Sequence, residues 1–69
     1  MYNYRRLKDT RTDRDFTQKE IANALGIDFR QYSRYENGTN QIPVNYLIAL
    51  ADFYGVTTDY LLGRAEQSK

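Results

Sequence analysis

The stretch GIDFRQYSRYENG, residues 26–38, combines basic and aromatic side chains at spacings that could contact a partner molecule. On a helix, with about 100° between successive residues, Tyr32 and Tyr35 fall about 60° apart and point inward. The opposite sector contains no acidic residue, whereas a solvated face usually mixes both charge signs. We expect that outward sector to carry four polar residues and, at its flank, one aromatic residue: Arg30, Ser33, Arg34, Asn37 and Phe29.

An arginine on such a face can donate two hydrogen bonds to guanine, and an exposed phenylalanine can contact a thymine methyl group. The alternatives are a solvated helix face for the arginines and a partly buried flank position for Phe29. The charge distribution gives weak support to an anionic partner: residues 1–38 contain eight of the ten Lys and Arg residues, against six acidic ones. The net charge of +1 is too small for binding a polyanion by charge alone.

The sequence contains few of the residue types that usually carry out catalysis. It contains no histidine and no cysteine, the commonest general bases, nucleophiles and transition-metal ligands. Asp9, Asp13 and Asp15 lack the glycine turn and distal glutamate of a calcium loop, and no glycine-rich phosphate loop is present. We therefore predict no enzymatic activity, no metal site, no cofactor and no small-molecule ligand.

The length of 69 residues predicts a single domain, which we place at residues 1–63, followed by a short tail at 64–69. No apolar run approaches the ~20 residues of a membrane span, and the start MYNYRRLKD lacks the apolar stretch of a signal peptide. These features predict a cytoplasmic protein without membrane contact.

Apolar residues recur at intervals of three and four, which predicts an all-α fold of five short helices. We expect the first helix to fray at TDRD, residues 12–15, and the others to begin near residues 17, 28, 43 and 57. Thr17 and Glu20 form a capping box, and Asp28 and Thr57 are the expected caps of the third and fifth helices. The predicted core face of the fourth helix consists of Leu47, Ile48, Leu50, Ala51 and Tyr54.

The second and third helices meet the demands of a helix-turn-helix. Such a motif needs a small residue where its helices cross, a glycine in its tight turn and apolar residues on the inner face of its second helix. Ala22, Gly26, Tyr32 and Tyr35 supply these in order and in register. The sequence therefore predicts a compact five-helix domain built around a helix-turn-helix.

The segments FTQKEIANALGI, YSRYENG, IPVNYLIALADFYGV and TTDYLLGR resemble the Cro/phage-repressor (Xre-like) family of helix-turn-helix regulators over roughly residues 5–63. The resemblance implies a lambda-repressor-like fold that binds double-stranded operator DNA. It implies that Arg34 contacts guanine and that Arg30 contacts a base or a phosphate, with Ser33 and Phe29 beside them. It implies a phosphate contact of Gln18 together with the amides at the start of the second helix, where Thr17 and Lys19 are further predicted DNA-binding residues. After the third helix, the backbone amides of Asn37 and Gly38 are implied to approach the phosphates, and Asn37 is also a predicted DNA-binding residue.

The resemblance further implies that Arg11 pairs with Glu36 and ties the first helix to the third. It implies a transcriptional regulator, a repressor that binds a near-palindromic operator as a homodimer. The dimer surface it implies is the fifth helix and the segment before it, including Val56, Thr58 and Tyr60; the alternative is that Tyr60 and Leu61 complete the core. The uncharged loop TNQIPVN, residues 39–45, departs from the family pattern and predicts few phosphate contacts. It leaves open an alternative: a protein-interaction module of the same fold, such as an antitoxin-like or anti-repressor subunit, without specific DNA binding.

Overall fold

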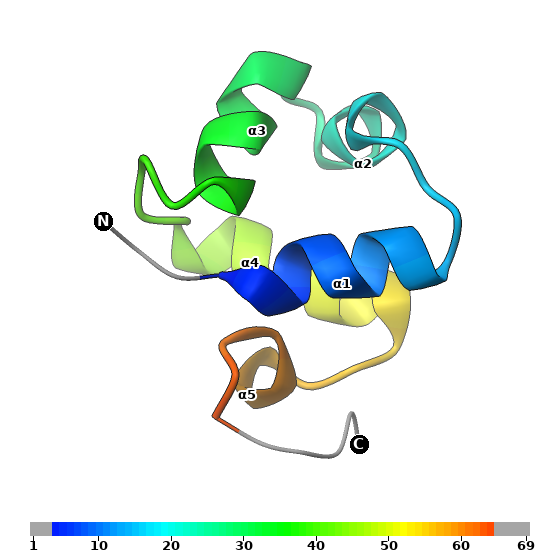
Figure 1. Cartoon of the computed structure of the whole chain (residues 1–69), viewed down its shortest axis with the longest axis vertical. Helices are drawn as coiled ribbons and strands as arrows, with labels where there is room; N and C mark the ends of the chain where they lie inside the picture. The colour runs from blue at the N-terminus through cyan, green and yellow to red at the C-terminus, as the bar shows by residue number, and fades with distance from the viewer. Residues whose placement is uncertain (1–3, 65–69) are drawn as a thin grey trace.

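The computed structural model describes residues 4–64 and contains five helices in this part of the chain (Figure 1). They are α1 (Arg5–Asp13), α2 (Gln18–Leu25), α3 (Phe29–Glu36), α4 (Val44–Tyr54) and α5 (Thr58–Leu61). No strand occurs in this range, so the predicted all-α class is confirmed. Of the predicted tail at residues 64–69, all but Arg64 lies outside the described residues. Within residues 4–64, no helix is long and apolar enough to span a membrane.

The predicted caps form as the sequence indicates. The Thr17 hydroxyl accepts a hydrogen bond from the Glu20 amide at 3.1 Å, and the Glu20 carboxylate accepts one from the Thr17 amide at 2.8 Å. Asp28 caps α3 through the Arg30 amide at 2.7 Å, and Thr57 caps α5 through the amide of Tyr60. These bonds satisfy amides that the first turn of a helix leaves without an intrahelical partner.

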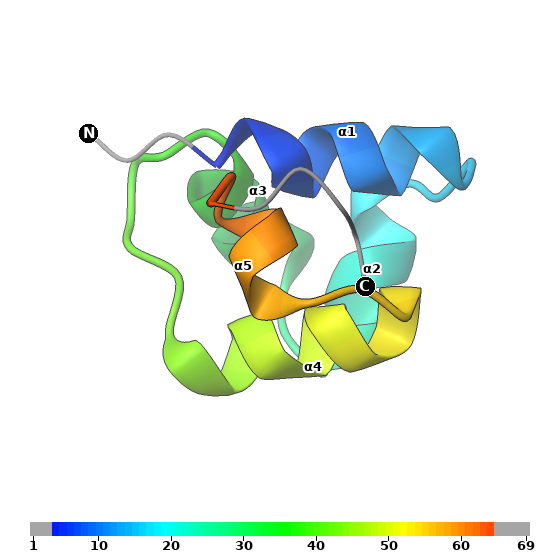
Figure 2. The same ribbon diagram turned by 90° about the horizontal axis from the view of Figure 1, so that it is seen from below.

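Side chains from all five helices meet in one core. Each helix contributes one of the largest fully buried apolar side chains, which are Leu7, Ile21, Tyr32, Leu50 and Leu61. In Figure 2, α1 and α4 form opposite sides of the molecule, and α5 lies between them. Each buried leucine or isoleucine stabilises the fold by about 1.5–3 kcal/mol, so these contacts hold helices that are too short to be stable alone.

The first helix ends at Asp13, inside the TDRD segment where the sequence predicted its end, and its Arg14 cap amide donates to the Arg11 carbonyl. One expectation for the core is wrong. Ile48 was expected in the core, but 48% of its surface is exposed. The apolar pattern misled because α4 carries apolar residues on both faces, and only the face with Leu47, Leu50, Ala51 and Tyr54 meets the other helices.

Candidate nucleic-acid interface

The turn between α2 and α3 fixes how the two helices cross. Gly26 ends α2 in the left-handed conformation with φ of 73°, which glycine adopts without the penalty of a side chain. The Ile27 amide then donates to the Ala22 carbonyl at 3.0 Å, and Asp28 opens α3 two residues after the glycine. Ala22 is buried, so the predicted small residue does lie inside the motif. This arrangement presents α2 and α3 together along one edge of the molecule (Figure 1).

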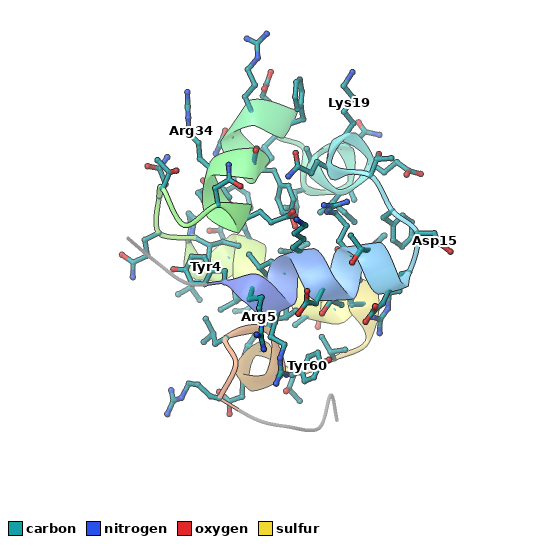
Figure 3. All side chains as sticks on the ribbon, viewed as in Figure 1. Tyr4, Arg5, Asp15, Lys19, Arg34 and Tyr60 are labelled. Carbon is teal, nitrogen blue, oxygen red and sulfur yellow. The ribbon has the colours of Figure 1, made fainter. Side chains whose placement is uncertain are left out.

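The two faces of α3 have opposite characters, as predicted. Tyr32 is fully buried and Tyr35 is 6% exposed, whereas Arg30 and Arg34 are exposed. The side chain of Arg34 makes no hydrogen bond, ion pair or ring contact with any residue in the range 4–64, and Figure 3 shows it extending away from the helix. Its guanidinium group is therefore available to a partner.

Phe29 lies between two cations rather than in the core. The Lys19 Nζ atom is 5.2 Å from the centre of the Phe29 ring, and the Arg30 guanidinium carbon is 5.8 Å from it. The ring is 38% exposed. Cation–π attraction therefore gathers two positive charges and one aromatic surface where α2 and α3 begin. The sequence predicted each of these residues as a contact but not that they touch one another.

The amino end of α2 has free amides beside this cluster. The capping box uses the amides of Thr17 and Glu20, while the amides of Gln18 and Lys19 donate to no group within residues 4–64. A helix amino terminus with free amides attracts a phosphate. The exposed Lys19 side chain, which projects from this edge in Figure 3, adds a positive charge there.

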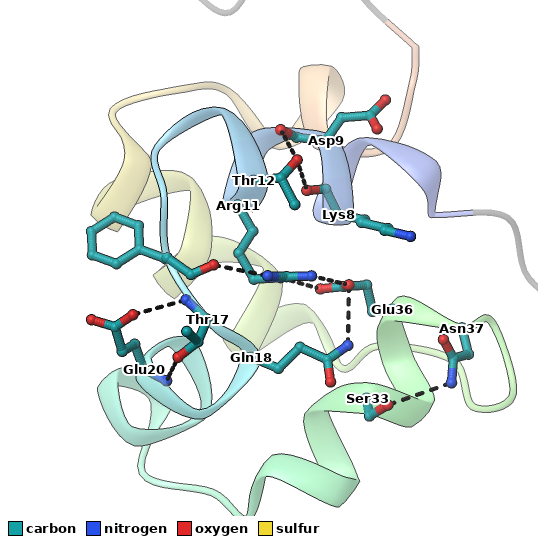
Figure 4. A network of polar contacts seen from close by, with 11 residues as sticks. Lys8, Asp9, Arg11, Thr12, Thr17, Gln18, Glu20, Ser33, Glu36 and Asn37 are labelled. Atoms are coloured by element: carbon teal, nitrogen blue, oxygen red, sulfur yellow. Dashed lines mark hydrogen bonds and ion pairs between the residues drawn. The ribbon is translucent and has the colours of Figure 1, made fainter.

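Gln18 takes a second role that the sequence did not reveal. Its half-buried side chain turns inward and donates to the Glu36 carboxylate at 3.2 Å (Figure 4). Because an amide nitrogen carries two protons, one remains for another acceptor. The predicted phosphate contact of Gln18 thus stays a prediction, now with a fixed side-chain orientation.

An ion pair below the interface connects α1 to the end of α3. The Arg11 guanidinium donates two hydrogen bonds to the Glu36 carboxylate, each 2.9 Å long, and a third to the Phe16 carbonyl at 2.8 Å (Figure 4). The side chains are 11% and 2% exposed, respectively. The pairing that the family resemblance implied is therefore confirmed, and the Arg11 guanidinium group is used in contacts within the domain.

This network controls the charge of Glu36. Burial by itself raises the pKa of the carboxyl group, but hydrogen bonds from Arg11 and Gln18 outweigh it and hold the pKa below its ordinary value. The hydrogen bond to Glu36 also raises the pKa of Arg11. Both groups stay ionised at neutral pH, so the bridge is a true ion pair.

The carboxyl end of α3 supplies side chains rather than amides. Asn37 is exposed, and its amide nitrogen donates to the half-buried Ser33 hydroxyl at 3.4 Å. The backbone amides of Asn37 and Gly38 already donate to the carbonyls of Ser33 and Tyr35. These two amides are therefore not free to donate to a phosphate, and the predicted contact of the Asn37 side chain stays a prediction.

The structure brings the predicted contacts together on one edge. Of the eight predicted contact residues, Gln18 and Ser33 are half-buried, and Gln18 turns toward the inner network. The other six are exposed: Thr17, Lys19, Phe29, Arg30, Arg34 and Asn37. The neighbouring carboxylates of Glu20 and Asp28 each accept one backbone amide. Within α3 the acidic residue is Glu36, which is buried and paired with Arg11, so the outward side of the helix carries no carboxylate.

Comparison with known proteins agrees with this geometry. Residues 7–61 match the family model described as Helix-turn-helix. The chain belongs to this helix-turn-helix family. The HTH-type transcriptional regulator ImmR of Bacillus subtilis is 42% identical over 65 residues, which cover 94% of this chain and 51% of ImmR. The cryptic phage CTXphi transcriptional repressor RstR of Vibrio cholerae is 36% identical over 61 residues, 88% of this chain and 55% of RstR.

The resemblance to Cro/phage-repressor regulators is thus confirmed by the family match and by these relatives. The HTH-type transcriptional regulator AnsR of Bacillus subtilis is 34% identical over 67 residues, 97% of this chain and 58% of AnsR. The chain spans about half the length of these curated relatives. No solved structure gives a significant match.

Proposed function

We propose that this chain is a sequence-specific DNA-binding transcriptional regulator, a repressor that binds a near-palindromic operator as a dimer. The main support for the proposal is that the two sides of α3 differ. Its tyrosines are buried, while Arg30 and Arg34 are exposed with no acidic residue between them. The names of ImmR and RstR, a transcriptional regulator and a transcriptional repressor, support the same function.

In this proposal α3 enters the major groove of DNA. Arg34 donates two hydrogen bonds to O6 and N7 of a guanine, the commonest specific contact in this groove. Arg30, beside the Phe29 ring, contacts a base or a phosphate, and Phe29 offers its exposed face to a thymine methyl group. Ser33 lies one turn from Arg30 along α3 and contacts the adjoining base edge.

The start of α2 holds the DNA backbone. The free amides of Gln18 and Lys19, the Lys19 ammonium group, the Thr17 hydroxyl proton and the spare Gln18 proton form a phosphate site. Asn37 contacts a second phosphate beyond the other end of α3. Such contacts set the position of the protein on DNA and carry no sequence information themselves.

Selection of bound duplexes from a random DNA pool tests the proposal. We expect a near-palindromic sequence to be enriched, and Arg34→Ala to weaken its binding by about 1–3 kcal/mol, or roughly 5- to 150-fold. Arg5→Ala is the matched control, because Arg5 is an exposed arginine of α1 (Figure 3), and its ion pair with Asp9 is exposed and long at 3.6 Å. It should leave specific affinity within about twofold.

The alternative, a protein-interaction module, predicts a different result. Its support is the uncharged loop at residues 39–45. If no sequence is enriched even at low salt, or if Arg34→Ala binds as tightly as the unaltered chain, the regulator proposal is wrong. In either case circular dichroism must show that the variant is folded.

A further inference from the structure

The Phe29 ring is an exposed aromatic surface held beside two cations. The Lys19 Nζ atom and the Arg30 guanidinium carbon lie 5.2 Å and 5.8 Å from the centre of the ring. Phe29 is 38% exposed, one of the large hydrophobic residues that the described chain leaves open to solvent. Attraction to two cations restricts the position of the ring before any partner binds. The ring and the Arg30 side chain therefore form one recognition unit at the start of α3.

We propose that Phe29 and Arg30 together recognise one base step in the major groove, in which a pyrimidine with a 5-methyl group neighbours a guanine. The inference rests on the function proposed above, and it assigns Arg30 to a base where that function leaves a base or a phosphate open. It also predicts that 5-methylcytosine can replace thymine at this step, because Phe29 recognises the methyl group whichever base carries it.

The positions of the three side chains in the helices support these roles. In a helix-turn-helix, the first residues of the second helix contact base edges, while the first helix crosses the DNA backbone. Phe29 and Arg30 are the first two residues of α3, whereas Lys19 belongs to α2. A planar guanidinium group matches O6 and N7 of guanine, and a lysine ammonium group binds phosphate as a point charge. Arg30 is therefore assigned to a guanine and Lys19 to the backbone.

The Arg30 donors are available for this contact. The guanidinium group forms no hydrogen bond or ion pair within residues 4–64, and its contact there is with the face of the Phe29 ring. The nearest carboxylate in the sequence, Asp28, accepts the backbone amide of Arg30 at 2.7 Å as the cap of α3. Arg30 can thus approach guanine without giving up a polar contact of the folded chain.

The chemistry of the phenyl ring limits what Phe29 can recognise. The ring has no hydrogen-bonding group, so the thymine methyl is the feature of the major groove that it can distinguish. Unmodified cytosine has a hydrogen atom in place of that methyl, and 5-methylcytosine has the methyl at the same ring position as thymine. A contact with Phe29 therefore favours thymine and 5-methylcytosine over uracil and cytosine.

The spacing of the two groups fits nearby base pairs. Successive bases along one DNA strand are about 3.4 Å apart, so one to two steps span about 3.4–6.8 Å. The separation of 5.8 Å between the Phe29 ring centre and the Arg30 guanidinium carbon falls in this range. Arg30 is exposed, so its flexible stem can adjust the remaining distance to the neighbouring base.

Base analogues test the methyl contact without altering the protein. In the duplex enriched from the random pool, each thymine that neighbours a guanine is replaced in turn by deoxyuridine, which lacks only the methyl group. At one such step the affinity should fall by about fourfold, the effect of one buried methyl group. At that step 5-methylcytosine, paired with guanine, should bind about fourfold more tightly than cytosine. Equal affinity for thymine and deoxyuridine at every such step would overturn the inference.

A substitution in the protein assigns the methyl contact to Phe29. Phe29→Ala should bind the thymine and deoxyuridine duplexes equally. Val44→Ala is the matched control, because Val44 is a 68% exposed apolar residue of α4, and this variant should keep the fourfold difference. A folded Phe29→Ala chain that keeps the full difference would show that another residue recognises the methyl group. The analogue series on the unaltered chain decides the question even if Phe29→Ala is unstable.

A guanine analogue tests the assignment of Arg30. Replacing the guanine of this step by 7-deazaguanine, which lacks the N7 acceptor, should weaken binding of the unaltered chain and leave binding of Arg30→Ala unchanged. Lys19→Gln should instead weaken binding to all sequences alike and reduce the salt slope by about one. If Arg30→Ala behaves like Lys19→Gln, Arg30 holds a phosphate and the inference is wrong.

The outcomes separate this inference from the proposed function. If the random pool yields no enriched sequence, both are overturned. If a sequence is enriched and its binding depends on Arg34 but on no thymine methyl group, the regulator function stands and recognition of the base step by Phe29 and Arg30 is refuted.

Discussion

Truncation of Glu36 to alanine should destabilise the domain by about 3 kcal/mol. The carboxylate is 2% exposed and accepts hydrogen bonds from Arg11 at 2.9 Å twice and from Gln18 at 3.2 Å. Hydrogen bonds to charged groups contribute about 1.5–3 kcal/mol each, and removal of one partner from a buried ion pair costs about 3–5 kcal/mol. We take the lower end because the Arg11 side chain is 11% exposed and retains its bond to the Phe16 carbonyl.

That loss is a large part of the total stability. A domain of 69 residues has about 3–10 kcal/mol of unfolding free energy. Each kcal/mol corresponds to about 4–8 °C in the melting temperature of a small domain, so Glu36→Ala should melt about 12–24 °C lower. Urea and thermal unfolding followed by circular dichroism measure both quantities.

Asp9→Ala provides the matched control. Asp9 pairs with Arg5 at 3.6 Å, but the two side chains are 51% and 78% exposed, and such surface pairs contribute little. This variant should lose less than about 0.5 kcal/mol. If both truncations cost the same within that margin, or if the melting temperature of Glu36→Ala is unchanged, the structural role assigned to the Arg11–Glu36 pair is wrong.

The same pair sets a dependence on pH. The pKa of Glu36 is lowered in the folded chain, so the stabilisation it provides is present above the pKa of the unfolded chain and is lost as pH falls through the folded value. The gap in unfolding free energy between the unaltered chain and Glu36→Ala should therefore narrow on acidification. A gap that stays constant from neutral to strongly acidic pH would show that Glu36 does not titrate through its pair with Arg11.

Three further substitutions test single features by urea unfolding. Thr17→Ala removes the hydroxyl of the capping box with Glu20 and should cost about 1 kcal/mol; no loss would mean that the cap is not needed. Gly26→Ala should cost about 1–2 kcal/mol from its φ of 73° alone, because an added Cβ meets no atom within 4 Å; a larger loss would indicate a clash. Tyr54→Phe should leave the free energy of unfolding unchanged or raise it slightly, because the buried hydroxyl has no hydrogen-bond partner in residues 4–64. Burial also raises the pKa of this hydroxyl to about 12. A loss of unfolding free energy above about 1 kcal/mol would show that the hydroxyl has a partner.

Local signals in the sequence predicted most of the fold. The caps at Thr17, Asp28 and Thr57 and the turn at Gly26 depend on neighbouring residues, so the sequence contains their full cause. The inward tyrosines of α3 followed from helical periodicity alone. The prediction for α4 was wrong at Ile48, which shares the periodicity of the core residues yet faces outward. The positions of the other helices decide which apolar side of α4 is covered, and local sequence does not contain that information.

The site shows the same division between local and long-range causes. The sequence predicted Lys19 and Phe29 as separate contacts, but their ring–cation contact depends on how α2 crosses α3. The inward turn of Gln18 depends on Glu36, which is 18 residues away along the chain. The Arg11–Glu36 bond has no local signature, and family resemblance alone pointed to it.

The inner network has consequences for the outer face of α3. This helix has eight residues and would not be stable in isolation, so its orientation comes from its buried contacts. Glu36 ties its carboxyl end to α1 through Arg11 and to the start of α2 through Gln18. The direction in which Arg34 projects is therefore set by groups behind the helix, of which only Gln18 also belongs to the proposed phosphate site. Changes at Glu36 should lower DNA affinity and stability together, whereas changes at Arg34 should lower affinity alone, because only the first alters the support of the helix.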